Sequence, residues 1–363
     1  MRKSKALYFK NLNGLRAIAA LLVVFTHVDL IKKKLGLPVS TKSSVLNLPI
    51  GSLSVTFFFV LSGFLISYLL LIEEQLNEKI NVKKFYVRRI LKIWPLYFLL
   101  AFIGFTFLIN QKGMEGLIPS LLCYAFILPN FASISNPLCF QSWSIGVEEQ
   151  FYLIWPLILN KRSILTISLT VIISFFILRT IPEICTVFKL HCPQIFINSR
   201  NVIMENRFDS MAIGAILAHF QFNNLLKFNV SVKHKYIFYF ILSAFFLVSN
   251  KLFYGTQHFI FSVLFAIYIY FQITDLKGNR FLESNIMKYL GKISFGIYMW
   301  HVVAIYLSIQ FINLFMTSIN YLSYGYNILL NTISIVITIL VAIFSFEFYE
   351  NYFLKIKHSF NKV

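Results

Sequence analysis

Nine ionisable residues interrupt the apolar runs of this sequence. A charged or titratable side chain inside an apolar segment is costly, and it is usually retained for binding, pairing or catalysis. The set contains imidazoles, carboxylates and guanidinium groups, which can act as a general base, as the partner that orients the base, and as anion ligands. The nine residues are Arg16, His27, Glu148, Glu149, Arg207, Asp209, His301, Glu347 and Glu350.

His27 and Glu148 are the two residues best suited to catalysis. His27 lies in the outer half of the first apolar run, and Glu148 lies about five residues below the outer end of the run that begins at Trp143. We therefore expect the two side chains at similar depth on separate helices, where the carboxylate can fix the tautomer of the imidazole and raise its basicity. The alternative is a buried polar pair that only holds two helices together.

A basic cluster is expected at the inner mouth of the same bundle. Arg16 precedes His27 by eleven residues, which is three helical turns, or about 16 Å along the axis, on nearly the same face. Arg88, Arg89 and Lys92 begin the third apolar run. Such a cluster can anchor the topology or contact lipid headgroups, or it can bind a phosphate-bearing ligand from the cytosol. The residues alone leave both interpretations open.

Five further residues are candidates for acceptor binding or support. Ser62 and Gly63 form a small-residue notch among aromatic residues, a pattern typical of close helix packing. Arg207 and Asp209 open the sixth apolar run at its outer end, where they could pair with each other or bind a polar acceptor. His301 lies in the middle of the ninth run, where a packing role is the more common one for a histidine.

The remaining candidates carry less information. Glu149 either assists Glu148 or faces lipid headgroups. The four cysteines, Cys123, Cys139, Cys185 and Cys192, show no metal-type spacing. A disulfide between them is permitted by the topology below, but four isolated thiols are the preferred interpretation. We expect no metal site.

The composition indicates that lipid is the solvent for most of the chain. Hydrophobic types make up 58% of the 363 residues and charged types 13%, whereas a soluble chain carries about 25% charge. So few charged residues cannot cover a water-facing surface. The net charge of +19 could suggest nucleic acid, but Lys and Arg cluster between apolar runs and not on one face of a soluble domain. We therefore expect no nucleic-acid partner.

The elements that must position these residues are transmembrane helices. The sequence predicts an all-α integral membrane protein with about ten such helices and both termini in the cytoplasm. This topology places 23 of the 33 Lys and Arg residues inside, as the positive-inside rule requires. Lys32, Lys33 and Lys34 are a local exception, because they fall outside. The predicted spans are approximately 14–31, 50–72, 93–110, 143–160, 163–180, 207–222, 236–250, 256–273, 293–315 and 325–350.

An eleventh apolar run, 116–129, contains Pro119 and Pro129. A full crossing here would invert every later loop and remove the charge bias, so we predict that 111–142 is an external segment with a re-entrant or interfacial piece. No linker or internal repeat divides the chain. Residues 1–363 are expected to form a single membrane domain with no fused soluble domain.

Six segments, in this order, resemble the motifs of the acyltransferase-3 family of membrane O-acyltransferases. Each motif is weak alone, but together they span nearly the whole chain. Lys92 stands where the family usually has arginine, which weakens the case for a bidentate phosphate contact there. The segments are Asn13–Ala20 with His27, Phe58–Phe64, Arg88–Pro95, Trp143–Tyr152, Arg207–Gly214 and Leu290–His301.

The resemblance implies a ten-helix acyltransferase domain in the inner (plasma) membrane. It implies acetyl-CoA or another acyl-CoA as the cytoplasmic co-substrate and a carbohydrate, such as a cell-surface glycan, as the acceptor. Membrane lipids are the other expected partners, and the oligomeric state stays open. His27 and Glu148 would be catalytic, with Arg16, Arg88, Arg89 and Lys92 on the CoA phosphates.

Two other function classes are compatible with several apolar helices that carry polar residues. A secondary transporter or a flippase of a sugar or lipid-linked sugar also has polar residues at mid-depth, but such folds tend to show repeats and broken helices. A non-catalytic receptor or scaffold would not explain why His27 and Glu148 are expected at similar depth. We favour the enzyme.

Overall fold

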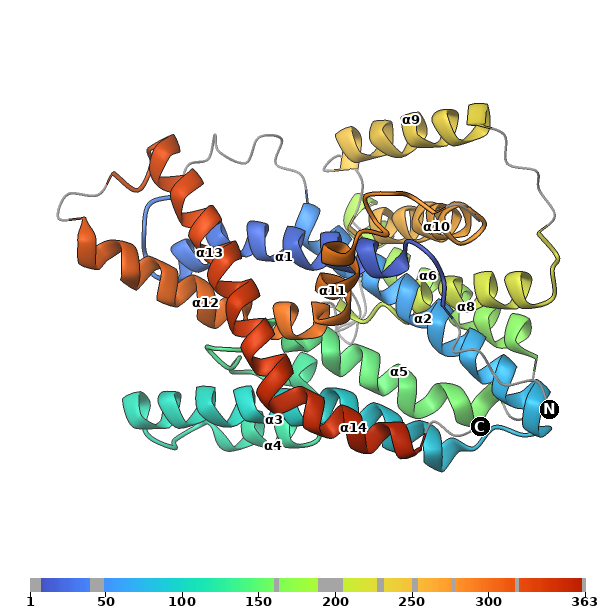
Figure 1. Cartoon of the computed structure of the whole chain (residues 1–363), viewed down its shortest axis with the longest axis horizontal. Coiled ribbons are helices and arrows are strands. Elements are labelled where there is room, and N and C mark those ends of the chain that lie inside the picture. The colour runs from blue at the N-terminus through green and yellow to red at the C-terminus, as the bar shows by residue number, and fades with distance from the viewer. Residues whose placement is uncertain are drawn as a thin grey trace.

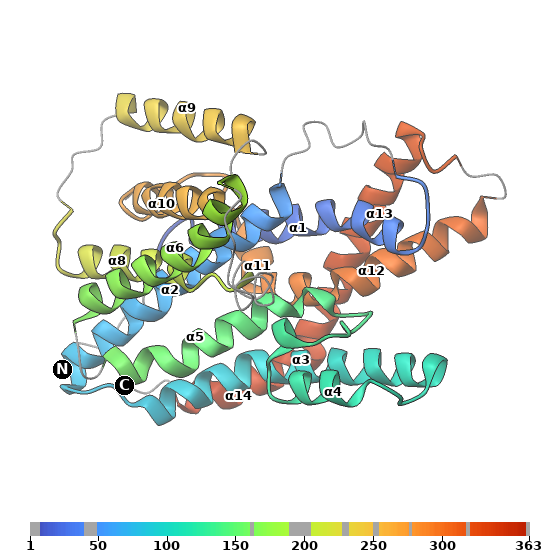
Figure 2. The same cartoon turned by 180° about the vertical axis from the view of Figure 1, so that it is seen from behind.

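The computed structural model describes residues 8–39, 49–159, 163–188, 205–226, 232–249, 254–275, 278–316 and 320–360. Every long regular element in these residues is a helix (Figures 1 and 2), which confirms the prediction of an all-α fold. The helices are α1 (Leu12–Lys34), α2 (Ile50–Asn77), α3 (Val82–Lys112), α4 (Ile118–Ala125), α5 (Trp143–Leu159), α6 (Ile164–Val187), α8 (Phe208–Phe222), α9 (Val232–Val248), α10 (Tyr254–Ile273), α11 (Asn285–Lys292), α12 (Ser294–Phe315), α13 (Tyr324–Ser345) and α14 (Asn351–Ser359).

Each of the ten predicted apolar runs coincides with one of these helices. Within the described residues, six helical segments are long and apolar enough to cross a membrane: Leu12–Lys34, Ile50–Asn77, Val82–Lys112, Ile164–Ile181, Ser294–Phe315 and Tyr324–Lys357. The chain is therefore a multi-pass membrane protein. Ten spans and cytoplasmic termini stay predictions.

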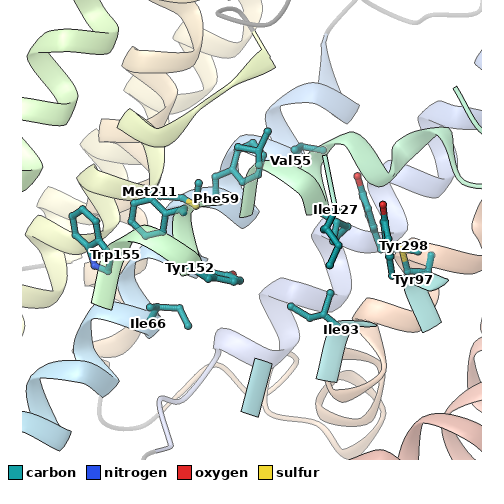
Figure 3. Close-up of a cluster of buried hydrophobic side chains, with 14 of the residues drawn as sticks. Val55, Phe59, Ile66, Ile93, Tyr97, Ile127, Tyr152, Trp155, Met211 and Tyr298 are labelled. Atoms are coloured by element: carbon teal, nitrogen blue, oxygen red, sulfur yellow. The ribbon is translucent and has the colours of Figure 1, made fainter. Parts of the chain in front are cut away.

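Helix α2 packs closely against α8 because glycines let the two backbones approach each other. A Cβ atom on Gly63 would lie within 1.9 Å of the Met211 carbonyl oxygen, and one on Gly214 would lie within 2.0 Å of the Val60 carbonyl oxygen. Only residues without a side chain permit this approach of two backbones. Figure 3 shows part of the apolar core beside this contact, with Phe59 and Met211 among its members.

The segment that follows α3 turns back along that helix. Tyr97 on α3 donates a hydrogen bond to the Tyr124 carbonyl at 3.0 Å, and Tyr97 precedes the end of α3 at Lys112 by fifteen residues, or about 22 Å. Helix α4 has eight residues, too few to cross a hydrocarbon core of about 30 Å. This path is the one expected of a re-entrant piece within 111–142, whose place in a membrane stays a prediction.

Asn136 holds the returning segment against α3. Its side chain is fully buried: Nδ2 donates to the Ala101 carbonyl at 2.9 Å, and Oδ1 accepts from the backbone N–H groups of Leu138 and Cys139. Gly104 leaves the space for this amide, because a Cβ atom there would overlap Asn136 Oδ1. Irregular backbone at membrane depth is tolerated only where protein satisfies its polar groups in this way.

The start of α1 is tied to the loop before α11. Glu283 accepts hydrogen bonds from the Asn11 backbone N–H at 2.5 Å and from the Tyr8 hydroxyl at 2.9 Å. Burial acts to raise the pKa of Glu283, but these hydrogen bonds and the nearby Lys288 outweigh it and hold the pKa below its ordinary value. Arg16, one turn into α1, is positioned by this attachment.

Candidate active site

A cavity of about 100 Å³ lies between α1, α2, α3, α5 and α12. Its walls combine aromatic side chains with several ionisable groups, the arrangement typical of ligand sites. Five of the residues predicted from the sequence line it: Arg16, Ser62, Arg89, Lys92 and Glu148. The other lining residues are Val55, Phe58, Phe59, Leu61, Leu65, Ile66, Ile93, Ser144, Ile145, Tyr152, Ser294, Phe295 and Tyr298.

One end of the cavity is basic. Arg16, Arg89 and Lys357 all act as like charges on Lys92, and Glu148 is the carboxylate that opposes them. Lys357 comes from α14, which packs against α3 (Figure 1). Like charges held together repel unless an anion joins them, so this end of the cavity is suited to a phosphate-bearing ligand.

Lys357 was not identified from the sequence as a site residue. The only sequence signal was its membership of the basic group at the C-terminal end. Between α13 and α14, residues Phe346–Glu350 form a π-helical segment, a feature often found at functional sites. Glu350 in this segment accepts a hydrogen bond from Ser345 at 3.0 Å and interacts with Lys92.

Glu148 is held inside the cavity. It accepts hydrogen bonds from the Ser62 hydroxyl at 2.8 Å and from the Tyr152 hydroxyl at 3.1 Å. It also interacts electrostatically with Arg16 and Lys92. These contacts direct the carboxylate toward the basic end of the cavity.

The expected contact between Glu148 and His27 is not found. Among the described residues no hydrogen bond joins the two side chains, and α1 packs mainly on α2, α11 and α12 rather than on α5. Counting residues along each helix gave the depth of the two groups, but not the direction in which each side chain points. The orienting role predicted for Glu148 therefore has no hydrogen bond to support it among the described residues, and it stays a prediction.

His27 lies beside a second histidine. Its ring centroid is 4.8 Å from that of His301 and 5.7 Å from that of Phe140. His27 Nδ1 lies 2.8 Å from the Val23 carbonyl oxygen, so Nδ1 carries the proton and Nε2 keeps a lone pair that can accept one. His301 makes the same kind of contact, with Nδ1 2.6 Å from the Tyr298 carbonyl oxygen.

Tyr298 lies between the cavity and the histidines. It lines the cavity, and its ring centroid is 5.8 Å from that of His301. Its hydroxyl is 2.7 Å from the Ser144 hydroxyl and donates to the Gln141 carbonyl at 2.9 Å. Tyr298 therefore connects the wall of the cavity with the pair of histidines.

Arg88 and Glu149 point away from the cavity. Arg88 forms an ion pair with Glu73 on α2 at 2.8 Å and is not among the residues that line the cavity. Its predicted contact with a phosphate group stays a prediction. Glu149 accepts a hydrogen bond from the Trp94 indole at 2.8 Å. It lines a separate cavity of about 250 Å³ that shares Arg89 with the first one.

Arg207 and Asp209 belong to a buried polar network that joins the start of α8 to α2 and α6. Asp209 forms an ion pair with Arg179 on α6 at 2.6 Å, and both side chains are almost completely buried. Arg207 donates to the Thr56 hydroxyl at 2.9 Å and to the Ser52 carbonyl at 3.0 Å. Neither residue is among those that line the cavity. These contacts join helices, and the acceptor-binding role predicted for the pair stays a prediction.

Two smaller predictions have clear outcomes. Gly63 packs against the α8 backbone, whereas its neighbour Ser62 lines the cavity. One residue of the notch therefore contributes to helix packing and the other to the cavity wall. Cys123, Cys139 and Cys185 are free thiols, and Cys192 lies outside the described residues.

The comparisons with known proteins agree with the motifs. A family model described as an acyltransferase domain matches residues 9–347. The O-acetyltransferase OatA of Staphylococcus aureus, from strains NCTC 8325 / PS 47 and MRSA252 alike, is 26% identical to this chain. The aligned length is 371, and the alignment covers 94% of this chain. The chain spans 57% of the length of these relatives. No solved structure matches it. The family match over most of its length shows that the chain belongs to the acyltransferase-3 family.

Proposed function

We propose that this enzyme transfers an acyl group, with acetyl expected, from cytoplasmic acyl-CoA to a hydroxyl of a carbohydrate acceptor at the inner (plasma) membrane. The observation that carries the proposal is a cavity lined by Arg16, Arg89 and Lys92, with Tyr298 in its wall next to the histidine pair. The relatives named as O-acetyltransferases support the choice of acyl group.

The basic end of the cavity would hold the phosphates of CoA. Arg16, Arg89, Lys92 and Lys357 supply charge-assisted hydrogen bonds, and Glu148 with Ser62 keeps these cations in place. Arg88 contributes less directly, because its guanidinium is already paired with Glu73. The thioester arm would extend past Tyr298 toward His27, which follows Arg16 by about 16 Å along α1.

His27 would act as the general base. Its Nε2 lone pair takes the proton of the acceptor hydroxyl while the oxygen forms a bond to the thioester carbonyl carbon. The carbon–sulfur bond then breaks, and the departing CoA thiolate takes the proton back from His27. His301, whose ring lies beside that of His27, helps to position the imidazole. An acyl-histidine intermediate on His27 is the alternative route.

The proposal is tested with the purified full chain in liposomes. Radiolabelled acetyl-CoA is supplied, and CoA release is measured with and without a crude surface-glycan extract. We expect glycan-dependent release from the wild type and none from His27→Ala, although this variant should still bind CoA, because His27 lies beyond the basic end of the cavity. Transfer by His27→Ala at a substantial rate would contradict the assignment of the base. If folded wild-type protein releases no CoA with any acyl-CoA or glycan, substrate flux becomes the next measurement.

A further inference from the structure

The three lysines that end α1 differ in their surroundings. Lys32 is fully buried and donates to the Tyr321 carbonyl at 3.0 Å and to Asn327 Oδ1 at 2.7 Å. It therefore joins α1 to the start of α13. Lys33 is exposed, and its position in the last turn suits the negative end of the helix dipole. These two lysines have structural explanations.

Lys34 is the last residue of α1, at the opposite end of this helix from Arg16, which is proposed to bind the CoA phosphates. It follows His27 by seven residues, which is two helical turns, so both side chains leave α1 on the same face. Lys34 Nζ is 3.3 Å from the centroid of the Phe140 ring, and this ring lies beside the His27 imidazole. Lys34 also interacts electrostatically with His27.

The charge of Lys34 is available to a ligand. The side chain is exposed, and among the described residues no carboxylate forms a salt bridge with it. A cation on the predicted outer side opposes the positive-inside rule. The helix dipole would account for a lysine anywhere in this turn, but not for one that lies on Phe140 beside His27. An exposed cation at the mouth of a site attracts and orients anionic substrates.

We infer that the acceptor carbohydrate carries a negative charge, as a carboxylate or a phosphate group, and that Lys34 binds this group while a nearby hydroxyl approaches His27 Nε2. The inference rests on the proposed function, because it needs His27 to be the base. It narrows the acceptor class to acidic sugars. Phe140 would form the wall between the two contacts.

The test compares matched acceptors. Wild type, Lys34→Met, Lys34→Arg and the neighbouring control Lys33→Met receive a uronic-acid oligosaccharide, its carboxyl-reduced neutral counterpart and a phosphate-bearing oligosaccharide. We expect wild type to prefer an anionic acceptor. Whichever of the two anionic acceptors has the higher kcat/KM identifies the bound group as a carboxylate or a phosphate. Lys34→Met should lower kcat/KM for that acceptor about tenfold and leave the neutral acceptor and the KM for acetyl-CoA unchanged. Lys34→Arg and Lys33→Met should keep the preference.

Several results would overturn the inference. A wild-type enzyme that uses the neutral acceptor as well as the anionic ones has no need of the cation. An equal loss with all three acceptors in Lys34→Met would indicate a structural role for Lys34. Transfer to none of the acceptors, together with no CoA release from the glycan extract, would remove the proposed function and this inference with it. The preference should also weaken as salt is added.

Discussion

Replacing Gly63 with alanine is expected to force α2 and α8 apart. The new Cβ atom would lie 1.9 Å from the Met211 carbonyl oxygen, whereas ordinary contact begins at 3.4 Å. The backbones would have to separate by about 1.5 Å, because the opposing atom is a backbone atom that cannot rotate away. Overpacking a well-packed core costs about 1–3 kcal/mol, and we expect a value at the upper end. Ser62 moves with Gly63, so acyl transfer should fall as well.

The assay is the apparent unfolding temperature in one detergent at one heating rate, which keeps any irreversible step constant. Gly325→Ala on α13 is the matched control, because a Cβ atom there meets nothing within 4 Å. Gly63→Ala should unfold several degrees below wild type, and Gly325→Ala should unfold at or above it. If the two variants unfold at the same temperature, the close approach of α2 and α8 is not what holds this part of the bundle together.

Three further predictions concern other parts of the chain. Lys357→Met should raise the KM for acetyl-CoA about tenfold with little change in kcat, whereas Lys355→Met on the same helix should not; equal effects would remove Lys357 from the donor site. Asp209→Asn should cost about 3–5 kcal/mol, since it breaks a buried ion pair with Arg179, and a wild-type unfolding temperature would contradict this. The lowered pKa of Glu283 means that its contribution to stability is present above pH 4.5 and lost as the pH falls further. Glu283→Gln should flatten that pH dependence of the unfolding temperature.

The sequence predicted the helices well because apolar runs report directly on lipid contact. The helix that contains the third predicted span is longer than that span: the span was predicted over 93–110, whereas α3 begins at Val82. The first turns of α3 are polar on one side, which lowers the hydropathy but not the helical tendency. Asn81 caps them by accepting a hydrogen bond from the Lys84 backbone N–H at 2.9 Å, and Phe85 buries the other side.

The candidate site could be predicted only in part. Motif positions identified Arg16, Lys92 and Glu148, and the structure brings these three to one cavity. Pairing across helices was not predictable, because depth follows from counting residues whereas direction depends on how the helices are rotated against each other. The sequence therefore predicted a carboxylate partner for His27, whereas the structure places His27 beside His301. Lys357 was missed for a similar reason, since only tertiary packing brings α14 to α3.

The returning segment between α3 and α5 sets the order in which this protein can be assembled. Its helix α4 is too short to be inserted as a span of its own, and its polar groups need partners that other elements provide. Asn136 requires the Ala101 carbonyl and the space left by Gly104, while Gln150 on α5 donates to Asn130 at 2.8 Å. The segment can therefore reach its final place only after α3 and α5 have both formed. Packing of this segment is thus a late step of folding, and a chain arrested before α5 emerges would hold its first helices but not the cavity that α5 helps to line.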